Sequence, residues 1–338
     1  MVKLSVVILN WNGRNHLERY LPSVVEHTVG EGVEVIVADN GSTDDSLLWL
    51  RMKYPELRVV RLDKNYGFAE GYNRALSEVE AEYYLLLNSD VEVTEGWWQP
   101  LVEVLDNNPD VAVVAPKLLS DAEHDKFEYA GAAGGFIDYL GYPFCRGRIL
   151  SKVESDCGQY DDRRDIFWAS GAAMCCRSEV YHQLGGFDAD FFAHMEEIDL
   201  CWRLRSRGRG IVCIPQSCVY HVGGATLNKS NPRKTYLNFR NNLLMLYKNL
   251  PENELRHVMF VRALLDYVAA FKSLLSGDAA GCRAVLQARR DFRRIKRDYS
   301  DLRRENLEKC VEADVKERTS FSILWKYYAE GRRLFSEL

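Results

Sequence analysis

The sequence predicts an α/β fold in which helices flank a mostly parallel sheet and an α-helical extension follows at the C-terminus. Two observations support this prediction. Short segments rich in Val, Ile and Leu recur through the first third of the chain, and each is separated from the next by a stretch long enough for a helix. This alternation is typical of parallel sheets, because parallel strands need a long crossover connection.

Five strands are expected in the first part of the chain, at residues 4–9 (LSVVIL), 33–38 (VEVIVA), 57–62 (LRVVRL), 83–87 (YYLLL) and 111–115 (VAVVA). Residues 16–28 and 45–55 are expected to form helices between them. In parallel sheets, ligands bind beyond the carboxyl ends of the strands. The residues that follow each strand are therefore the first place to look for function.

Regularity is lost between residues 120 and 165, where a Gly- and Tyr-rich stretch favours loops or a short antiparallel ribbon facing the substrate. Strand-like and helix-like segments return at 167–186 and 211–220. After Pro251 the sequence becomes helical, charged and poor in glycine. We therefore expect a catalytic domain at 1–250 and a helical extension at 251–338.

Composition narrows the class of protein. A net charge of −5 gives no general attraction to nucleic acid, so no nucleic-acid partner is expected. The nine cysteines include no CxxC pair, which favours reduced thiols and a cytoplasmic location. The apolar run near the N-terminus is too short for a signal peptide or a membrane span.

Polar residues follow four of the expected strands. Asn, Asp and Gly also favour turns and helix N-caps, so one such group alone would indicate little. Four groups at one edge of a sheet indicate a ligand site. They are Asn10-Trp11-Asn12-Gly13, Asp39-Asn40-Gly41-Ser42, Asn65-Tyr66-Gly67 and Asn88-Ser89-Asp90.

No GxGxxG or GxxxxGK[ST] motif is present, so a different mode of nucleotide binding is needed. Asp39 could accept a hydrogen bond from a pyrimidine imide N–H. Asn65, Gly67 and Asn73 would let the backbone approach a ribose or phosphate closely. Asp90 could hold a hard divalent cation, because Mg²⁺ and Mn²⁺ prefer oxygen ligands.

Six segments in this order resemble the inverting family 2 glycosyltransferases, which have the GT-A nucleotide-diphospho-sugar transferase fold. The resemblance spans roughly residues 4–226. Any one of these segments alone would be a weak indication of the family, but six in the same order are a strong one. They are VVILNWNG, VIVADNGSTDDS, NYGFAEGYNRAL, YYLLLNSDVEV, SGAAMCCRSEVYHQLGGFDADFFAHMEEIDLCWRLRSRG and VYHVGGAT.

The resemblance implies roles on the donor side. Asp39 matches the aspartate that contacts uracil or thymine, and Asn65, Gly67 and Asn73 match a loop that cradles the nucleotide. We count Asn10 with these nucleotide-sugar-binding candidates.

A metal site is also implied. Residues 88–90 (NSD) resemble the metal-binding DxD motif with Asn88 in place of the first acid, which leaves Asp90 as the main carboxylate ligand. Ser89 of the same motif is a further nucleotide-sugar-binding candidate. His221 resembles a histidine that completes the metal shell in part of the family. The expected cofactor is a divalent metal, Mg or Mn.

Three carboxylates crowd residues 196–199 at the start of an expected helix. Considered alone, they are better explained by a solvated, capped helix start than by catalysis. In the family, the second residue of an acidic pair is the general base; that position is Glu197 here, with Glu196 as the competing candidate. Asp199 could cap the helix, and with Gly171 and Trp202 it is placed on the acceptor side.

Two effects on the proton affinity of these carboxylates oppose each other. Like charges held close raise at least one pKa, whereas the N-terminal end of a helix favours the ionised form. The sequence leaves the outcome open.

The C-terminal part combines apolar helical spacing with positive charge. Residues 256–299 hold ten Lys or Arg and four Asp, net +6. Arg289, Arg293 and Arg297 form an i,i+4 stripe. A helix on an anionic membrane surface fits this pattern, and a hairpin packed on the catalytic domain or in a homodimer fits it nearly as well.

The sequence thus predicts a cytoplasmic, peripherally membrane-associated inverting glycosyltransferase. Its donor would be a UDP- or dTDP-sugar, and its acceptor a glycan or lipid-linked saccharide in cell-surface polysaccharide assembly. Rhamnosyltransferases are the nearest subgroup by resemblance. The alternatives are a nucleotide-sugar-binding protein without transfer activity and a sugar nucleotidyltransferase.

Overall fold

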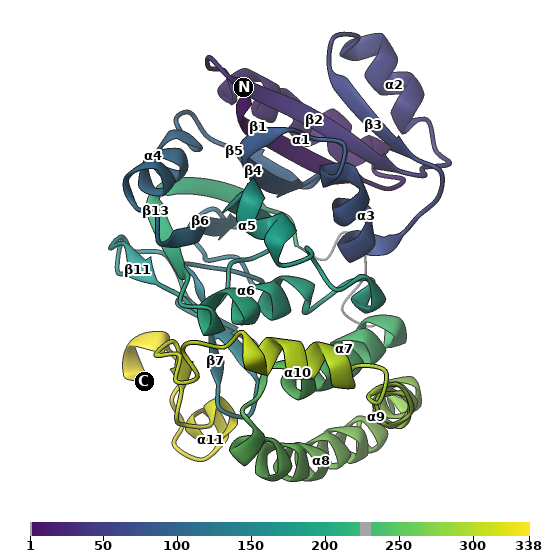
Figure 1. Cartoon of the computed structure of the whole chain (residues 1–338), viewed down its shortest axis with the longest axis vertical. Helices are drawn as coiled ribbons and strands as arrows, with labels where there is room; N and C mark the ends of the chain where they lie inside the picture. The colour runs from purple at the N-terminus through teal and green to yellow at the C-terminus, as the bar shows by residue number, and fades with distance from the viewer. Residues whose placement is uncertain (1, 224–230) are drawn as a thin grey trace.

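The computed structural model describes residues 2–223 and 231–338, and its centre is a nine-stranded mixed sheet (Figure 1). The strand order is β11-β13-β6-β12-β4-β1-β2-β3, with β5 paired to β13. The five expected strands are confirmed as β1, β2, β3, β4 and β6. The strands are β1 Val2–Asn10, β2 Val33–Asn40, β3 Arg58–Leu62, β4 Ala81–Asn88, β5 Val91–Val93, β6 Val111–Ser120, β11 Arg164–Asp165, β12 Ala173–Arg177 and β13 Gly210–His221.

The parallel part of this sheet is β3-β2-β1-β4, as the crossover pattern predicts. Strand β12 reverses direction between β4 and β6, while β13 runs parallel to β6. The register pairs Asn10 with Asp39 and Leu9 with Asn88. The polar residues that follow these strands therefore lie at one edge.

Helices cover both faces of the sheet with separate apolar cores. Leu17 and Leu101 belong to the core under α1 and α4, and Tyr72 and Leu200 to the core under α3 and α6. Trp97 of this region is fully buried, and its indole N–H donates to the Thr28 hydroxyl. The helices are α1 Arg14–His27, α2 Ser46–Lys53, α3 Gly67–Leu76, α4 Gln99–Asn107, α5 Ser178–Gln183 and α6 Glu196–Ser206.

A second, five-stranded sheet occupies the irregular region, in the order β10-β9-β8-β7-β14. The expected antiparallel ribbon is present in β7 to β10. Its outer strand β14 comes from the far end of the chain and pairs parallel with β7, which no local pattern indicates. The strands are β7 Gly135–Asp138, β8 Pro143–Cys145, β9 Arg148–Ile149, β10 Lys152–Val153 and β14 Arg318–Thr319.

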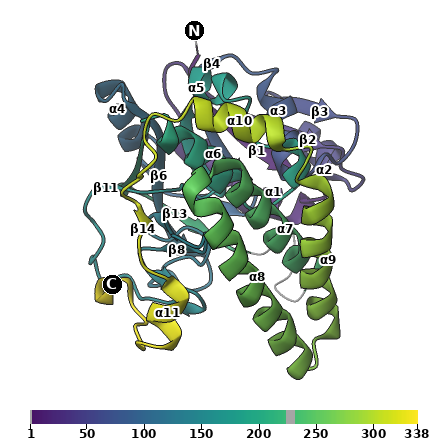
Figure 2. The ribbon, with the colours of Figure 1, turned by 60° about the horizontal axis from the view of Figure 1, so that its bottom comes forward.

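The C-terminal part is helical, as expected, and packs below the main sheet (Figure 1). Helices α8 and α9 form a hairpin, which Figure 2 shows end to end. None of the described helices is long and apolar enough to cross a membrane. The helices are α7 Pro232–Asn249, α8 Glu252–Leu275, α9 Ala279–Ile295, α10 Ser300–Glu308 and α11 Ile323–Tyr328, with 3-10 turns η1 Ala189–Phe191 and η2 Phe335–Glu337.

One detail of the arginine stripe is wrong. Arg289 does not lie on a free cationic face: it is buried and paired with Asp266 of α8, which also faces Arg262 at 3.5 Å. A buried carboxylate needs such partners, since an unpaired charge away from water is costly. Arg293 and Arg297 remain exposed.

Candidate active site

Asp39 ends β2 with its carboxylate fixed at the sheet edge. Its Oδ1 accepts from Asn10 Nδ2 at 3.1 Å, and its Oδ2 accepts from the Ser42 backbone N–H at 3.0 Å. The side chain is only 1% exposed, so these donors offset much of the cost of burying the charge. The carboxylate oxygens keep further acceptor capacity for a ligand N–H.

Ser89 lies beside the turn that follows β1. A Cβ built on Gly13 would lie 2.4 Å from Asn10 Oδ1 and 3.5 Å from Ser89 Oγ. A side chain at residue 13 would collide with the Asn10 amide, and the turn after β1 lies close to Ser89. The structure thus brings together Asn10, Asp39 and Ser89.

Asn65 and Gly67 form the start of α3. Asn65 Oδ1 accepts from the Gly67 backbone N–H at 2.8 Å. Gly67 has φ +80°, and a Cβ there would lie 2.5 Å from the Phe192 carbonyl oxygen. The close backbone approach expected at this glycine is made by the segment that precedes α6.

The structure does not bring Asn73 to the Asp39 group. Its Nδ2 donates to the Phe187 carbonyl at 2.9 Å, and its Oδ1 accepts from the Phe187 N–H and the Tyr181 hydroxyl. The Asn73 amide therefore holds α3 against α5 and the chain that follows it.

Asp90 and His221 meet where β4 and β13 end. His221 Nε2 lies 3.3 Å from Asp90 Oδ1, and its Nδ1 lies 3.5 Å from Glu128 Oε1. Burial opposes a charged ring, but the hydrogen bonds and charges of Glu128 and Asp90 outweigh it and raise the pKa of His221 to about 10. This position favours positive charge. Residues 224–226 of the VYHVGGAT segment lie outside the described residues.

These donors fit a divalent cation that is shared with a ligand. Asp90 offers a carboxylate oxygen and His221 a ring nitrogen, and Glu128 would orient the ring from its other nitrogen. Within the described residues no three His, Cys, Asp or Glu side chains form a metal cluster of their own. A metal here would need further oxygen ligands, such as those of a diphosphate. Glu128 lies in the irregular region, where no motif pointed to a functional residue.

Glu196 and Glu197 begin α6. Within the described chain, a buried Oε2 atom of each has no hydrogen-bond partner. Burial and the charge of Glu197 raise the pKa of Glu196 well above its usual range. Burial also raises the pKa of Glu197 to about 7, against the lowering effect of backbone N–H groups at the helix start. Desolvation therefore decides the balance that the sequence left open, and Glu197 has the proton affinity of a general base at neutral pH.

Gly171 connects Glu197 to the donor edge. A Cβ on Gly171 would lie 3.9 Å from Glu197 Cβ and 3.0 Å from the Phe68 ring, so this glycine permits close packing of α3 and α6. The next residue, Ala172, accepts from the Asn88 backbone N–H at 2.9 Å. Only the backbone of Gly171 and Ala172 therefore lies between Glu197 and the NSD segment.

The segment before α6 has an unusual backbone. Phe192, His194 and Met195 all have positive φ, at 64°, 72° and 74°. Such values are strained for bulky residues and concentrate at functional sites. Asn241 of α7 holds the segment, because its Nδ2 lies within 3.0 Å of the carbonyl oxygens of Phe191, Ala193 and His194. Sequence reasoning missed Asn241.

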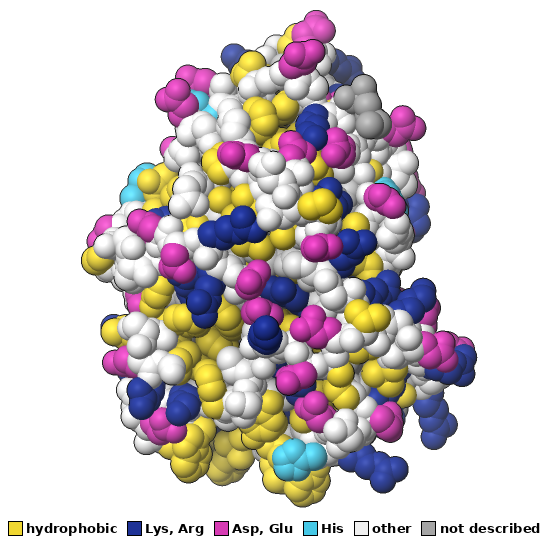
Figure 3. Space-filling view, turned by 60° about the vertical axis from the view of Figure 1, so that its left-hand side comes forward, with side chains coloured by type: hydrophobic (Ala, Val, Ile, Leu, Met, Phe, Trp, Pro, Cys, Tyr) yellow, Lys and Arg dark blue, Asp and Glu magenta, His cyan; other side chains and the backbone are white. Residues whose placement is uncertain are grey.

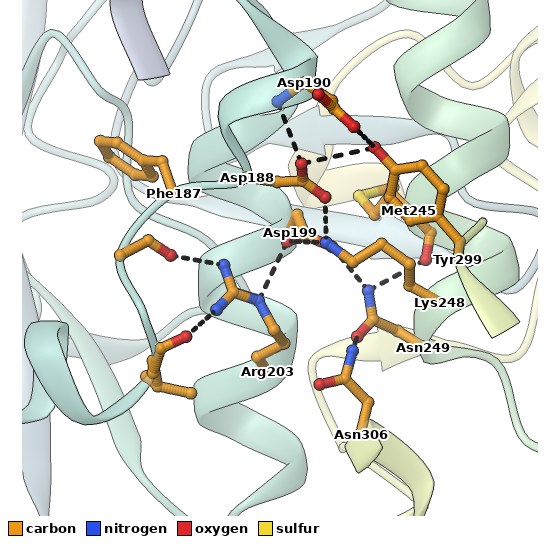
Figure 4. Close-up of polar contacts among 12 residues, drawn as sticks. Phe187, Asp188, Asp190, Asp199, Arg203, Met245, Lys248, Asn249, Tyr299 and Asn306 are labelled. Carbon is orange, nitrogen blue, oxygen red and sulfur yellow. Dashed lines mark hydrogen bonds and ion pairs between the residues drawn. The ribbon is translucent and has the colours of Figure 1, made fainter. Parts of the chain in front are cut away.

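Asp199 and Trp202 lie in the interior and present no surface to an acceptor. Asp199 is fully buried and accepts from Arg203, Lys248 and Asn249 (Figure 4). Trp202 is 3% exposed and packs edge-on against Phe167. Both residues point from α6 into the protein, where they fix the helix that carries Glu197.

Lys248 links this network to a second acidic pair. Its Nζ lies 2.6 Å from Asp188 and 2.9 Å from Asp199, and Tyr299 donates to Asp190 beside them (Figure 4). The helix bearing the proposed base is therefore fastened to α7 and to the chain before α10.

Comparison with known structures defines the class. The chain superimposes on GalNAc-T7, solved with UDP, GalNAc and Mn²⁺, with a TM-score of 0.61 at 15% identity, covering 98% of this chain and 57% of that one. At this identity the likeness shows the fold. The chain therefore has the GT-A fold.

Sequence relatives give the family. The family model described as Glycosyl transferase family 2 matches residues 5–153. The N-acetylglucosaminyl-diphospho-decaprenol L-rhamnosyltransferase of Mycobacterium tuberculosis strain H37Rv is 27% identical over 64% of this chain and 75% of its own. The O-antigen biosynthesis protein RfbC of Myxococcus xanthus is 26% identical over 66% of this chain and 18% of its own. The chain therefore carries a family 2 glycosyltransferase domain over residues 5–153, and its relatives include a rhamnosyltransferase.

Proposed function

We propose that this enzyme transfers a hexose or deoxyhexose, with inversion, from a UDP- or dTDP-sugar to a glycan or lipid-linked saccharide in cell-surface polysaccharide assembly. The names of its relatives support the acceptor class, since one acts on a diphospho-decaprenol-linked sugar and another belongs to O-antigen biosynthesis. The UDP in the GalNAc-T7 structure supports a nucleoside diphosphate leaving group.

The donor would bind along the strand edge. Asp39, fixed by Asn10, would accept from the imide N–H of the base. Asn65 and Gly67 at the start of α3 and Ser89 would line the ribose and diphosphate. The edge gathers these residues from separate strands, as α/β sheets do for nucleotides.

Asp90 and His221 would hold a Mg²⁺ or Mn²⁺ ion, with Glu128 orienting the histidine ring. When bound, such an ion supplies positive charge that offsets the negative charge of the departing diphosphate. The Mn²⁺ of GalNAc-T7 and the two carboxylates that flank the His221 ring support the assignment.

Glu197 would act as the general base. Its carboxylate would take the proton of the acceptor hydroxyl while that oxygen attacks the anomeric carbon from the face opposite the diphosphate. The C–O bond to the diphosphate breaks, and the bonding electron pair leaves with the phosphate oxygen. The observation on which the proposal rests is the unpartnered Glu197 carboxylate oxygen beside the Gly171–Ala172 stretch, which bonds to the NSD segment.

A lipid-linked acceptor lies in a membrane, so the proposal includes a cytoplasmic enzyme in peripheral contact with an anionic membrane face. The charge of the C-terminal helices supports this location.

Incubation with candidate nucleotide sugars and Mn²⁺ tests the reaction class. Separation of the products by anion exchange is expected to show UDP or dTDP formed with one sugar and stimulated by a saccharide acceptor. Release of pyrophosphate from a nucleoside triphosphate would instead support the nucleotidyltransferase alternative. Donor binding without release of either product, across the full panel of sugars and acceptors, would support the binding protein without transfer activity.

A further inference from the structure

The outward face of α8 is unusually apolar. Seven large side chains are exposed at helical spacing, from Phe260 at 65% to Leu275 at 73%, whereas the opposite face, including Val258 and Ala270, is buried. Residues three, four and seven apart share one side of a helix, so these side chains form one continuous stripe. We call this stripe the outer face of α8. It consists of Phe260, Leu264, Tyr267, Val268, Phe271, Leu274 and Leu275.

Two aromatic residues of α11 extend the outer face. Trp325 and Tyr328 are 65% and 63% exposed, and Lys272 Nζ of α8 lies 5.6 Å from the centre of the Tyr328 ring. Figure 2 shows α8 at the front of the lower end, between α9 and α11. Figure 3 shows hydrophobic side chains along the lower edge of the molecule, where Figure 1 places α8 and α11. Contiguous apolar surface of this kind marks an interaction site.

The rim of the outer face is basic. Arg293 of α9 donates to the hydroxyl of Tyr267 at 2.9 Å, which places this cation beside the stripe. Asp266 is buried with Arg262 and Arg289, so it contributes no free negative charge to the surface. Other exposed cations of the two helices are Arg256, Lys272, Arg283, Arg290 and Arg294.

We propose that the outer face of α8 docks on an anionic lipid bilayer, with its apolar side chains in the headgroup and acyl boundary and the arginines of α9 on lipid phosphates. A helix with an apolar face and a cationic flank binds in this way, and Trp and Tyr favour the same boundary. The docking proposal rests on the proposed function in one respect: a docked enzyme would meet the lipid-linked acceptor at the membrane surface.

Charge favours lipid over a second copy of the chain. Two copies joined symmetrically through this face would bring their basic rims together, and like charges facing each other oppose association. An anionic bilayer instead attracts the rim, and long cationic side chains can reach its headgroups from a helix lying in the interface.

Sedimentation of the full chain with vesicles tests the proposal without sugar transfer. Wild type is expected to bind vesicles containing about 30% phosphatidylglycerol in phosphatidylcholine, and at least about tenfold less to phosphatidylcholine alone. The double variant Leu264→Gln/Phe271→Gln should weaken binding to the anionic vesicles by at least about tenfold. The matched control is Leu48→Gln/Met52→Gln on α2, which removes two equally exposed apolar side chains and should bind as wild type does.

Three outcomes would overturn the docking proposal. The first is equal loss of vesicle binding in the α2 control, and the second is no vesicle binding by wild type. The third is a wild-type dimer by sedimentation velocity that does not bind the vesicles and that Leu264→Gln/Phe271→Gln converts to monomer. Nucleoside diphosphate release with a water-soluble acceptor should be unchanged in Leu264→Gln/Phe271→Gln, and its absence in wild type would count against the proposed function alone.

Discussion

The donor half and the base half of the candidate site are held by different parts of the chain. In the donor half, Asn10 and Asp39 occupy paired positions on adjacent parallel strands and bond directly to each other. In the base half, the segment before α6 has a strained backbone that α7 holds through Asn241. Sheet register fixes the first half locally, whereas the second depends on contacts some 50 residues away in the sequence.

This difference predicts that the base half can be loosened while the donor half is kept. The largest effect is expected for Lys248→Met, which leaves the fully buried Asp199 and the partly buried Asp188 without their shared cation. Removing one member of a buried ion pair lowers the free energy of unfolding by about 3–5 kcal/mol. Urea denaturation measures it. In the control Lys309→Met, which removes an exposed pair with Glu305, the change should stay below about 1 kcal/mol.

Asn241→Ala should impair the base half of the site, measured by kcat, while leaving the donor half, measured by KM for the donor, nearly unchanged. Without its amide, the carbonyl groups of residues 191–194 lose their shared donor, and Glu197 shifts relative to the donor edge. Small misplacements of a reacting group cost about 10²-fold, so kcat should fall by about that factor while KM for the donor stays within about twofold. Asn238→Ala, which removes only a bond to Lys234 of the same helix, is the matched control. An equal fall in kcat in both variants would contradict the role of Asn241 in holding residues 191–194.

The pH dependence of kcat/KM should follow the ionisation of Glu197 in the base half. Glu197 acts only when deprotonated, and its pKa is raised to about 7, so the rate should increase with pH up to that value and then level off. At pH 6 it should be about tenfold below the plateau. A plateau that extends unchanged down to pH 5 would show that no base with this pKa is needed.

The smallest effect is expected in the donor half, for Asp39→Asn. The amide keeps the size of the side chain but loses the charge, and a hydrogen bond to a neutral acceptor is weaker by about 1 kcal/mol. The dissociation constant of UDP, measured calorimetrically, should rise about fivefold with kcat little changed. Asp63→Asn, an exposed aspartate bonded to Tyr66, should bind UDP as wild type does. If Asp39→Asn bound UDP as tightly as wild type, Asp39 would not be the residue that contacts the nucleobase.

The two halves also differ in how far the sequence predicted them. Strand patterns and the polar residues after them led to Asn10, Asp39 and Ser89 at one edge, because parallel strands place their ends together. The acidic pair at the start of the expected helix led us to place Asp199 and Trp202 on the acceptor side, yet both face inward. Helix spacing alone does not tell which side of α6 meets α7.

Other features had no local signal. The positive φ of Phe192 and Met195 is imposed by contacts with α3 and α7, and neither residue type favours it. Glu128 reaches His221 from the second-sheet region, and β14 joins β7 across the whole chain. Contacts of this kind depend on tertiary packing, which a single sequence does not encode in any short pattern.

The central claim is that Glu197 removes the acceptor proton next to a donor site that forms independently of it. Turnover and UDP binding of Glu197→Gln, measured beside Glu196→Gln, test it most directly. We predict that Glu197→Gln lowers kcat by about 10³-fold, while UDP with Mn²⁺ still raises its melting temperature as in wild type, and that Glu196→Gln stays within about tenfold of wild-type turnover. Retention of more than about a tenth of the activity in Glu197→Gln, or a loss confined to Glu196→Gln, would contradict the account.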